Sequence, residues 1–490
     1  MHPILRQFAA SLAVLQLSSL LLAADPPQLT LLFPAGGQIG TSVEVTATGK
    51  FPTWPAKIWS DSPHIEWSCL AEAGKLQAKI SDQAPAGLQW VRLYDAAGAT
   101  QVFPFLIDAY PQARETEPND RNDTANASSG LPSTFHGVLN KTADVDLISV
   151  TLADDDWLVA TLDSAKWLLS PADACLQILD SRGFVLAENL DHVGLDPYLE
   201  YQAPRAGKYF VRVFGFPATP NSTIAFSGGS DWIYRLRLSD RPDPLGTALD
   251  IANQKEVSSS CAEIPAAKHT AADRAYALSL PAQVTGTVSQ PKEINYLRFT
   301  AQAGKTYRVR LWARHFGSPL DASLAILDAS GKQLVQQDDV AQDRDPLVNW
   351  KAPADGDFVL AIRDFHRQGG AGFRYQLKLE ERTPDYAATL ATDLITADVD
   401  KEVEVVVNIA RELDFPGTIS VSLKGVPDFV QAPSVESKHG TDTAGKVSLK
   451  LKASQAFQGP IEILATSTAE PNPEQRAATA GNRPLWLSIR

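Results

Sequence analysis

The chain has 490 residues, with 57 Asp and Glu against 44 Lys and Arg, so its formal net charge is −13. This acidic balance argues against nucleic acid or an anionic membrane as the main partner, because both are bound through a basic surface. The length predicts three or four domains with ordinary hydrophobic cores, since roughly 100–200 residues form one domain.

The first 24 residues have the composition of a secretory signal peptide. Arg6 precedes an apolar run from Phe8 to Leu22, which is shorter than the roughly 20 residues of a membrane-spanning helix, and two alanines follow it. We expect residues 1–24 to be removed on export, and the cleavage position has no Cys for a lipid anchor. No later stretch is apolar enough to span a membrane. The sequence thus predicts a secreted, periplasmic or cell-envelope protein without an anchor.

The chain has three cysteines, Cys69, Cys175 and Cys261. They are too few and too scattered for a disulfide framework, and no Cys/His spacing indicates a metal site. We interpret them as small buried apolar side chains, so stability must come from ordinary cores.

Short runs of alternating apolar and polar residues recur along the chain, separated by clusters of Gly, Pro, Asn and Asp. Residues 90–94 and 209–213 are examples. A period of two is typical of antiparallel sheets with one solvent-exposed face, and no segment shows a long stripe at helical spacing. The sequence therefore predicts an all-β protein made of tandem β-sandwich domains.

Four sandwiches are expected in chain order. Residues 25–110 form the first, and residues 111–240 and 275–382 form two copies of another. The copies are recognised because residues 170–183 match residues 318–331, and the match resumes one residue out of step at Asp196 and Asp345.

Residues 241–274, rich in Asp, Ala and Ser, are expected to be a linker, either loosely packed or holding a short helix. Residues 383–490 form the fourth sandwich. Its expected strands are 402–409, 418–423, 446–452, 460–465 and 485–489, with a loop at 469–482.

The first copy opens with Glu115-Thr116-Glu117-Pro118-Asn119-Asp120, followed by Gly137-Val138-Leu139 and Asp144-Val145-Asp146. With its later Leu-Asp-x-x-Gly and Ala-Pro-x-x-Gly-x-Tyr turns, this copy resembles the bacterial pre-peptidase C-terminal (PPC) domain family. That family consists of jelly-roll-like β-sandwiches found beside secreted peptidases and in other exported proteins. The second copy keeps only the back half of the pattern.

The outer units resemble immunoglobulin-like folds. Residues 25–110 are similar to the IPT/TIG type through Pro-x-Gly-Gly-x-x-Gly-x-x-Val, and residues 383–490 resemble generic bacterial modules of this kind. The whole string of modules resembles exported multi-domain proteins of planctomycete-type bacteria.

The resemblance to the PPC family implies a calcium site, because some members bind Ca²⁺ through these acidic segments. Carried onto this sequence, the ligands are Glu115, Glu117, Asn119, Asp120, Asp144 and Asp146. The chemistry agrees, since Ca²⁺ takes about 6–8 hard oxygen ligands. The alternative is that these are solvated acids on a linker and a turn. In the second copy Glu293 and Asn295 replace the aspartate pair, so a site there should be weak or lost.

No catalytic motif occurs: the chain lacks His-Glu-x-x-His, Gly-x-Ser-x-Gly and the phosphate-binding Gly-rich loop. We therefore expect a protein that is not an enzyme. Several tryptophans either line a sugar or peptide groove or, as is more usual in sandwiches, belong to the core. They are Trp54, Trp167, Trp232 and Trp312.

These observations predict an exported, non-catalytic multi-module protein. We expect it to bind protein or polysaccharide at the cell surface or in the periplasm, with Ca²⁺ stabilising the first PPC-like copy. Two alternatives remain open, namely a structural spacer of the envelope and an accessory component of a secreted peptidase. The sequence identifies neither the ligand nor the oligomeric state.

Overall fold

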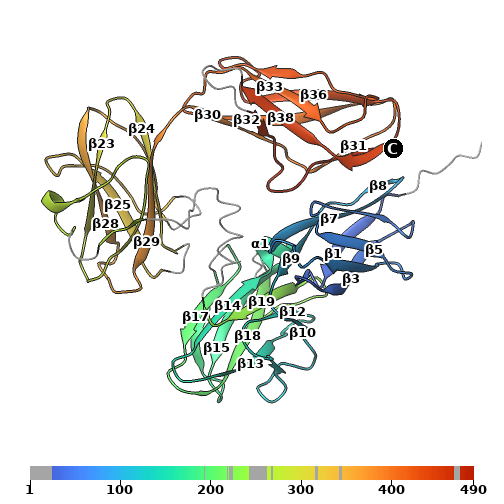
Figure 1. Cartoon of the computed structure of the whole chain (residues 1–490), viewed down its shortest axis with the longest axis horizontal. Helices are drawn as coiled ribbons and strands as arrows, with labels where there is room; N and C mark the ends of the chain where they lie inside the picture. The colour runs from blue at the N-terminus through green and yellow to red at the C-terminus, as the bar shows by residue number, and fades with distance from the viewer. Residues whose placement is uncertain are drawn as a thin grey trace, which may run out of the picture.

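The computed structural model describes residues 25–191, 194–217, 219, 225–241, 262–265, 269–314, 318–340, 345–467 and 475–490. The expected signal peptide and Cys261 lie outside these ranges. Within them the chain is almost entirely β, with one four-residue α-helix, α1 (Ala165–Leu168), and one 3₁₀ turn, η1 (Ala272–Arg274). The predicted fold class, tandem β-sandwiches, is confirmed. Figure 1 shows four β units, the first packed beside the second and the fourth beside the first.

The first unit is a sandwich of two sheets around one apolar core. One sheet has the order β1 (Gln28–Phe33), β3 (Ser42–Lys50), β6 (Lys75–Ile80), β5 (Ile65–Cys69). The other has the order β2 (Gly36–Gln38), β9 (Phe103–Asp108), β7 (Gly87–Asp95), β4 (Lys57–Ser60), and β8 (Gly98–Ala99) pairs with β7. Alternation builds the core: in β6, Leu76, Ala78 and Ile80 are buried and the residues between them face outward.

The first copy is also a two-sheet sandwich. One sheet has the order β10 (Gln112–Arg114), β12 (Ser133–Val138), β19 (Ile233–Ser239), β14 (Trp157–Asp163), β17 (Tyr198–Gln202). The other has the order β11 (Asn126–Ala127), β13 (Asp146–Leu152), β18 (Gly207–Pro217), β15 (Ala172–Leu179), β16 (Val185–Asn189).

The second copy repeats this strand order in both sheets. One has the order β20 (Ala262–Glu263), β22 (Ala282–Thr287), β29 (Arg374–Arg382), β24 (Thr306–Trp312), β27 (Leu347–Lys351). The other has the order β21 (Tyr276–Ala277), β23 (Asn295–Ala301), β28 (Gly356–Asp364), β25 (Ala322–Leu327), β26 (Gln333–Gln337). The internal sequence match is therefore a repeat of one sandwich. The spacing between matched residues of the two copies changes by one residue between β16 and Asp196.

The segment expected to be a linker contributes to the second copy. Within residues 241–274, strand β20 pairs in parallel with β22, and η1 follows it. The sheet of the second copy thus begins before residue 275, because the edge of β22 is covered by this short strand. Residues 242–261 lie outside the described ranges.

The fourth unit holds its strands close to the expected positions. One sheet has the order β30 (Asp385–Thr389), β32 (Glu402–Glu412), β36 (Lys446–Ala453), β34 (Val430–Gln431). A second has the order β35 (Val435–Ser437), β33 (Ile419–Lys424), β38 (Glu462–Ser467), β39 (Gln475–Ala477), and a third the order β31 (Leu394–Ala397), β40 (Trp486–Ile489), β37 (Phe457–Pro460). Strand β39 lies in the segment expected to be a loop, where it pairs with β38.

The core interpretation of the tryptophans is correct. Trp167, Trp232 and Trp312 are buried, and Trp54 packs on the first core while its indole N–H donates to the Leu70 carbonyl at 2.8 Å. The burial of Trp167, Trp232 and Trp312 and the packing of Trp54 on the first core argue against a groove lined by these four side chains. Cys69 and Cys175 are free thiols, and burial raises the pKa of Cys175 to about 12.

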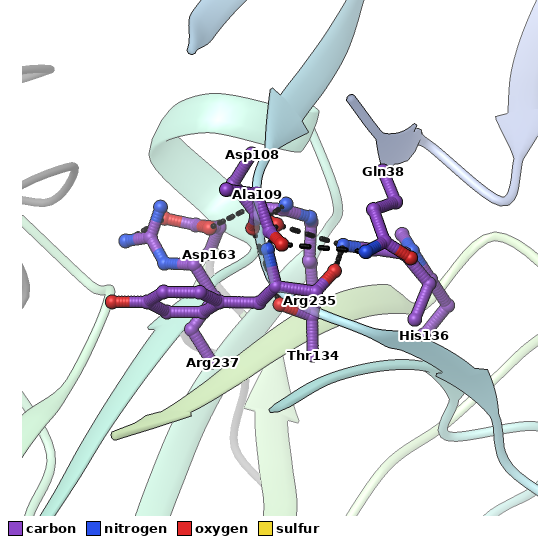
Figure 2. A network of polar contacts seen from close by, with 10 residues as sticks. Gln38, Asp108, Ala109, Thr134, His136, Asp163, Arg235 and Arg237 are labelled. Carbon is purple, nitrogen blue, oxygen red and sulfur yellow. Dashed lines mark hydrogen bonds and ion pairs between the residues drawn. The ribbon is translucent and has the colours of Figure 1, made fainter. Parts of the chain in front are cut away.

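A buried polar network joins the first unit to the first copy (Figure 2). The guanidinium of Arg235 on β19 is fully buried and pairs with Asp108, at the end of β9, and with Asp163 of β14, the latter at 3.5 Å. Arg237 approaches the same Asp163 carboxylate at 3.5 Å, and the Thr134 hydroxyl donates to Asp108 at 3.2 Å. Two buried carboxylates thus face two buried guanidinium groups, so the charges balance.

An apolar cluster continues this junction. Ala35 and Leu106 of the first unit pack with Trp167 and Leu168 of α1 and with Ile233 of β19. The short helix therefore has a packing role, because its two large side chains cover β9 of the neighbouring unit. The two units form one packed body.

The first and fourth units are also in contact, although they lie at opposite ends of the chain. The Arg92 guanidinium on β7 is fully buried and donates to Asp393 at 2.5 Å, across 301 positions of sequence. Arg92 lies over the Trp486 ring at 5.4 Å, and Trp59 and Tyr94 pack on the same ring at 5.7 and 5.0 Å. The chain therefore folds back on itself, as Figure 1 shows.

Candidate functional site

The acidic segment that opens the first copy crosses the start of β13. The backbone N–H of Leu147 donates to the Asn119 carbonyl at 3.1 Å, which holds the opening segment against the strand. Ala143, just before the acidic pair, adopts a left-handed conformation with φ of 64°, which turns the chain into β13. The two acidic segments are therefore brought together by backbone contacts.

Three of the predicted ligands form a compact group. One carboxylate oxygen each from Glu117, Asp120 and Asp144 lies within 4.8 Å of the others. Asp144 is fully buried, and the Asn140 side-chain amide donates to Glu117 at 2.7 Å. We call these three residues the acidic cluster.

Lys141 is the cation that faces the acidic cluster. Its ammonium nitrogen lies 3.4 Å from Asp144 and 3.7 Å from Asp120. These carboxylates raise the pKa of Lys141, with Asp144 making the largest contribution. Among the residues that the structure describes, Lys141 is the cation paired with the cluster, so three carboxylates face one ammonium group.

Two more predicted ligands form a second, more deeply buried pair. Glu115 accepts hydrogen bonds from the Val138 N–H at 2.6 Å and the Tyr234 hydroxyl at 3.2 Å. Asp146 is fully buried beside it. Burial and then the neighbouring Glu115 carboxylate raise the pKa of Asp146 to about 10, and burial raises the pKa of Glu115. The pair therefore retains one proton at neutral pH.

The sixth predicted ligand, Asn119, has a buried side chain with unused hydrogen-bonding capacity. It is fully buried, and neither its Oδ1 nor its Nδ2 has a hydrogen-bond partner. Its backbone N–H donates to Glu117 at 3.0 Å, so Asn119 adjoins the acidic cluster. A buried amide without partners is unfavourable by about 1–3 kcal/mol, and a cation bound by the oxygen would offset that cost.

The structure thus places the six predicted residues in two adjoining groups. Sequence reasoning missed Lys141, Asn140 and Tyr234, which contact the acids directly. The turn position of Asn140 and Lys141, three or four residues before Asp144, was a usable signal for the first two. Tyr234 had no local signal, because it is brought in by the pairing of β12 with β19.

The second copy lacks this concentration of acids among the residues that the structure describes. The Asn295 amide replaces the carboxylate of Asp146 and donates to the Thr287 carbonyl at 2.8 Å. Glu293, in place of Asp144, accepts from the Gln290 N–H at 2.9 Å. Tyr375 stands where Tyr234 does. The second copy therefore keeps the strands and the tyrosine of this region, but it does not keep the carboxylates that face one another in the first copy.

Comparisons with known proteins match parts of the chain. No protein-family model matches the chain. A 74-residue stretch is 36% identical to part of a probable subtilase-type serine protease of Deinococcus radiodurans, covering 15% of this chain and 10% of that protein. The chain thus spans a small part of the length of this curated relative.

Two solved structures are similar in fold to parts of the chain. The pre-peptidase C-terminal domain of the collagenase from Bacillus anthracis matches over its whole length and 26% of this chain, with 16% identity and a TM-score of 0.19. The fibronectin(III)-like modules of CbhA from Clostridium thermocellum match over 87% of their length and 39% of this chain, with 7% identity and a TM-score of 0.15.

None of the helices in the described ranges is long and apolar enough to cross a membrane.

Proposed function

We propose that the chain is an exported, non-catalytic binding protein of the cell surface or periplasm, in which Ca²⁺ stabilises the first PPC-like copy. The observation that carries this proposal is the acidic cluster beside the unpartnered, buried Asn119 amide. Export rests on the signal-peptide composition of residues 1–24. Binding of protein or polysaccharide rests on the module types, since sandwiches of this kind display loops and sheet faces on a rigid scaffold.

The residues present fit a calcium ion. Glu117, Asp120, Asp144 and the Asn119 amide supply hard oxygens, the donor type that Ca²⁺ takes in proteins. Bound Ca²⁺ would supply the positive charge that the cluster lacks, and it would displace the Lys141 ammonium as counter-ion. Because the two acidic segments would then share one ion, unfolding of the opening segment would require its release.

A second candidate function is an accessory component of a secreted peptidase. It is favoured by one observation, the 36% identity over 74 residues to a probable subtilase-type serine protease. The third possibility, a structural spacer of the envelope, is disfavoured because the first and fourth units contact one another through Arg92, Asp393 and Trp486. A chain folded back in this way spans little distance.

Calcium titration tests the central part of the proposal. We expect isothermal titration calorimetry to detect Ca²⁺ binding to the chain without its signal segment, and Glu117→Gln or Asp144→Asn to abolish it. Ca²⁺ at about 100 times its Kd should add roughly 2.7 kcal/mol to the free energy of unfolding. Glu293→Gln, the corresponding change in the second copy, is the matched control and should leave binding unchanged.

Two results would contradict the proposal. Absence of a binding heat, together with an unchanged melting temperature in EDTA, would remove calcium from it. Peptidase or glycosidase activity of the purified chain would remove the non-catalytic assignment. Envelope components are then passed over the immobilised chain with and without Ca²⁺. Retention of a component supports the role of a binding protein, and no retention in either condition supports the role of a spacer.

A further inference from the structure

A pocket of 530 Å³ adjoins the acidic cluster on the outer face of the β13 sheet. Its floor is apolar, formed by Val145, Leu147 and Leu179, of which the last two are almost fully buried. Asp120, a member of the acidic cluster, and Lys141, which pairs with it, also line the pocket. The pocket and the proposed metal site therefore share side chains.

A second cation, Arg212 of β18, lines the same pocket. Its Nε donates to the side-chain carbonyl of Gln177 at 2.7 Å, which fixes the orientation of the guanidinium. A guanidinium has five N–H groups, so Arg212 keeps donors for a ligand. The wall of the pocket contains two positively charged side chains, Lys141 and Arg212, and one negatively charged side chain, Asp120. Its net charge is therefore +1.

The second copy supplies an internal comparison. The register pairs Leu147 with Arg212 in the first copy, and Tyr296 with Ala361 at the same place in the second. Lys141 corresponds to Gln290. Each of these residues lies four positions after the glycine that pairs with the tyrosine of its copy. The second copy thus lacks both pocket cations, and of the aspartate pair it keeps one carboxylate, that of Glu293.

In the first copy the two cations stand beside the carboxylates that face one another, and the corresponding positions of the second copy hold neither cation. An apolar floor with two cations in the wall suits a ligand that has both an aliphatic group and a carboxylate.

We propose that this pocket binds the C-terminal carboxylate and last aliphatic side chain of a peptide, with Arg212 and Lys141 as the carboxylate contacts. A sugar is disfavoured because none of the described residues in its lining is aromatic. The inference rests on the proposed function in one respect: Ca²⁺ at the acidic cluster would neutralise Asp120 and free Lys141 to face the pocket.

The simplest probe is a matched pair of small molecules. N-acetyl-leucine carries the aliphatic side chain and the carboxylate, and N-acetyl-leucinamide differs only in lacking the negative charge. We expect the acid to bind at least about tenfold more tightly than the amide in the presence of Ca²⁺, because one charge-assisted hydrogen bond accounts for that much. Binding is followed through the leucine methyl resonances of the chain, and EDTA should weaken it.

Substitutions that copy the second sandwich give the sharpest test. Arg212→Ala should weaken binding of the acid at least about tenfold while leaving Ca²⁺ binding unchanged. Lys141→Gln should weaken binding of the acid and tighten binding of Ca²⁺, since it removes the competing ammonium. Lys208→Gln, an exposed change on the same strand, is the control and should alter neither.

The outcomes separate this inference from the proposed function. Equal affinities for acid and amide, with Ca²⁺ bound normally, would overturn the pocket inference and leave the metal site standing. Binding of the acid that survives EDTA unchanged would overturn the coupling to the metal. Loss of Ca²⁺ binding in Arg212→Ala would assign that residue to the scaffold and would also overturn the inference.

Discussion

The buried arginines of β19 differ between the two copies in a way that local structure does not explain. Arg235 and Arg237 of the first copy correspond to Gln376 and Lys378 of the second, at the same register positions. In the first copy, Arg235 pairs with Asp108 of another unit. A buried guanidinium is tolerated there because a carboxylate from a different sandwich pairs with it.

His136 makes this junction sensitive to pH. It is fully buried, and its Nε2 donates to the Gln112 side-chain carbonyl at 2.7 Å. Burial, with smaller effects from the Arg235 and Arg114 charges, holds the pKa of His136 well below its ordinary value. The folded chain therefore keeps this histidine neutral, whereas the unfolded chain takes up a proton below about pH 6.5.

We expect this group to contribute stability above pH 6.5 that is lost as the pH falls. Its contribution should make the free energy of unfolding fall as the pH decreases below about 6.5, with a slope of at most about 1.4 kcal/mol per pH unit. Urea unfolding followed by tryptophan fluorescence should show a shallower pH dependence for His136→Gln than for the unchanged chain. The exposed His439→Gln is the control. Identical slopes for all three proteins would show that His136 does not titrate between the two states.

At the scale of strands, both copies use a glycine opposite a tyrosine to make space for the ring, which in the first copy lies beside Glu115. Gly137 pairs with Tyr234, and Gly286 with Tyr375. A Cβ atom at Gly137 would lie 2.1 Å from the Tyr234 ring, and one at Gly286 would lie 2.5 Å from Tyr375. The absent side chain makes the space that the ring occupies, so the two strands and the tyrosine form one unit.

Gly137→Ala should therefore destabilise the first copy. Overpacking of this kind costs about 1–3 kcal/mol, and the displaced Tyr234 ring would lose its hydrogen bond to Glu115. The measurement is the midpoint of chemical unfolding. Gly207→Ala, where an added Cβ meets nothing within 4 Å, provides a comparison that should change stability little. Equal midpoints for the two variants would contradict the explanation.

At the scale of the whole molecule, contact between the two ends of the chain determines its shape. Asp393 and Trp486 of the fourth unit enclose the Arg92 guanidinium of the first, and Arg92 also donates to the Thr100 carbonyl. The ion pair is buried, so loss of one partner leaves an unbalanced charge away from water. The two units that flank the second copy in the chain, the first copy and the fourth unit, thereby both contact the first unit.

Asp393→Ala is expected to open this contact. Removal of one partner of a buried ion pair costs about 3–5 kcal/mol, because the other charge stays buried without a partner. Small-angle X-ray scattering should then show a larger radius of gyration, with each sandwich still folded. Asp398→Ala, at an exposed ion pair with Arg490, should leave the scattering unchanged. An unaltered radius for Asp393→Ala would mean that the apolar contacts of Trp486 suffice.

The sequence by itself determined the β architecture, the repeat and most of the candidate site. Alternation and turn residues act over a few positions, so they are visible in any sandwich sequence. The acids of the cluster were found because they lie in two short segments. The residues that balance or complement them, such as Lys141 and Arg212, were not, because their roles depend on which strands become neighbours.

Only the tertiary structure decided how the units meet. Arg92 and Asp393 lie 301 positions apart, and Arg235 finds Asp108 in a different sandwich. Neither pair has a local pattern, because a contact between separately folded units depends on the outer surfaces of both. The physical reason is that periodicity encodes which face of a strand is buried in its own core, and carries no record of what later covers the opposite face.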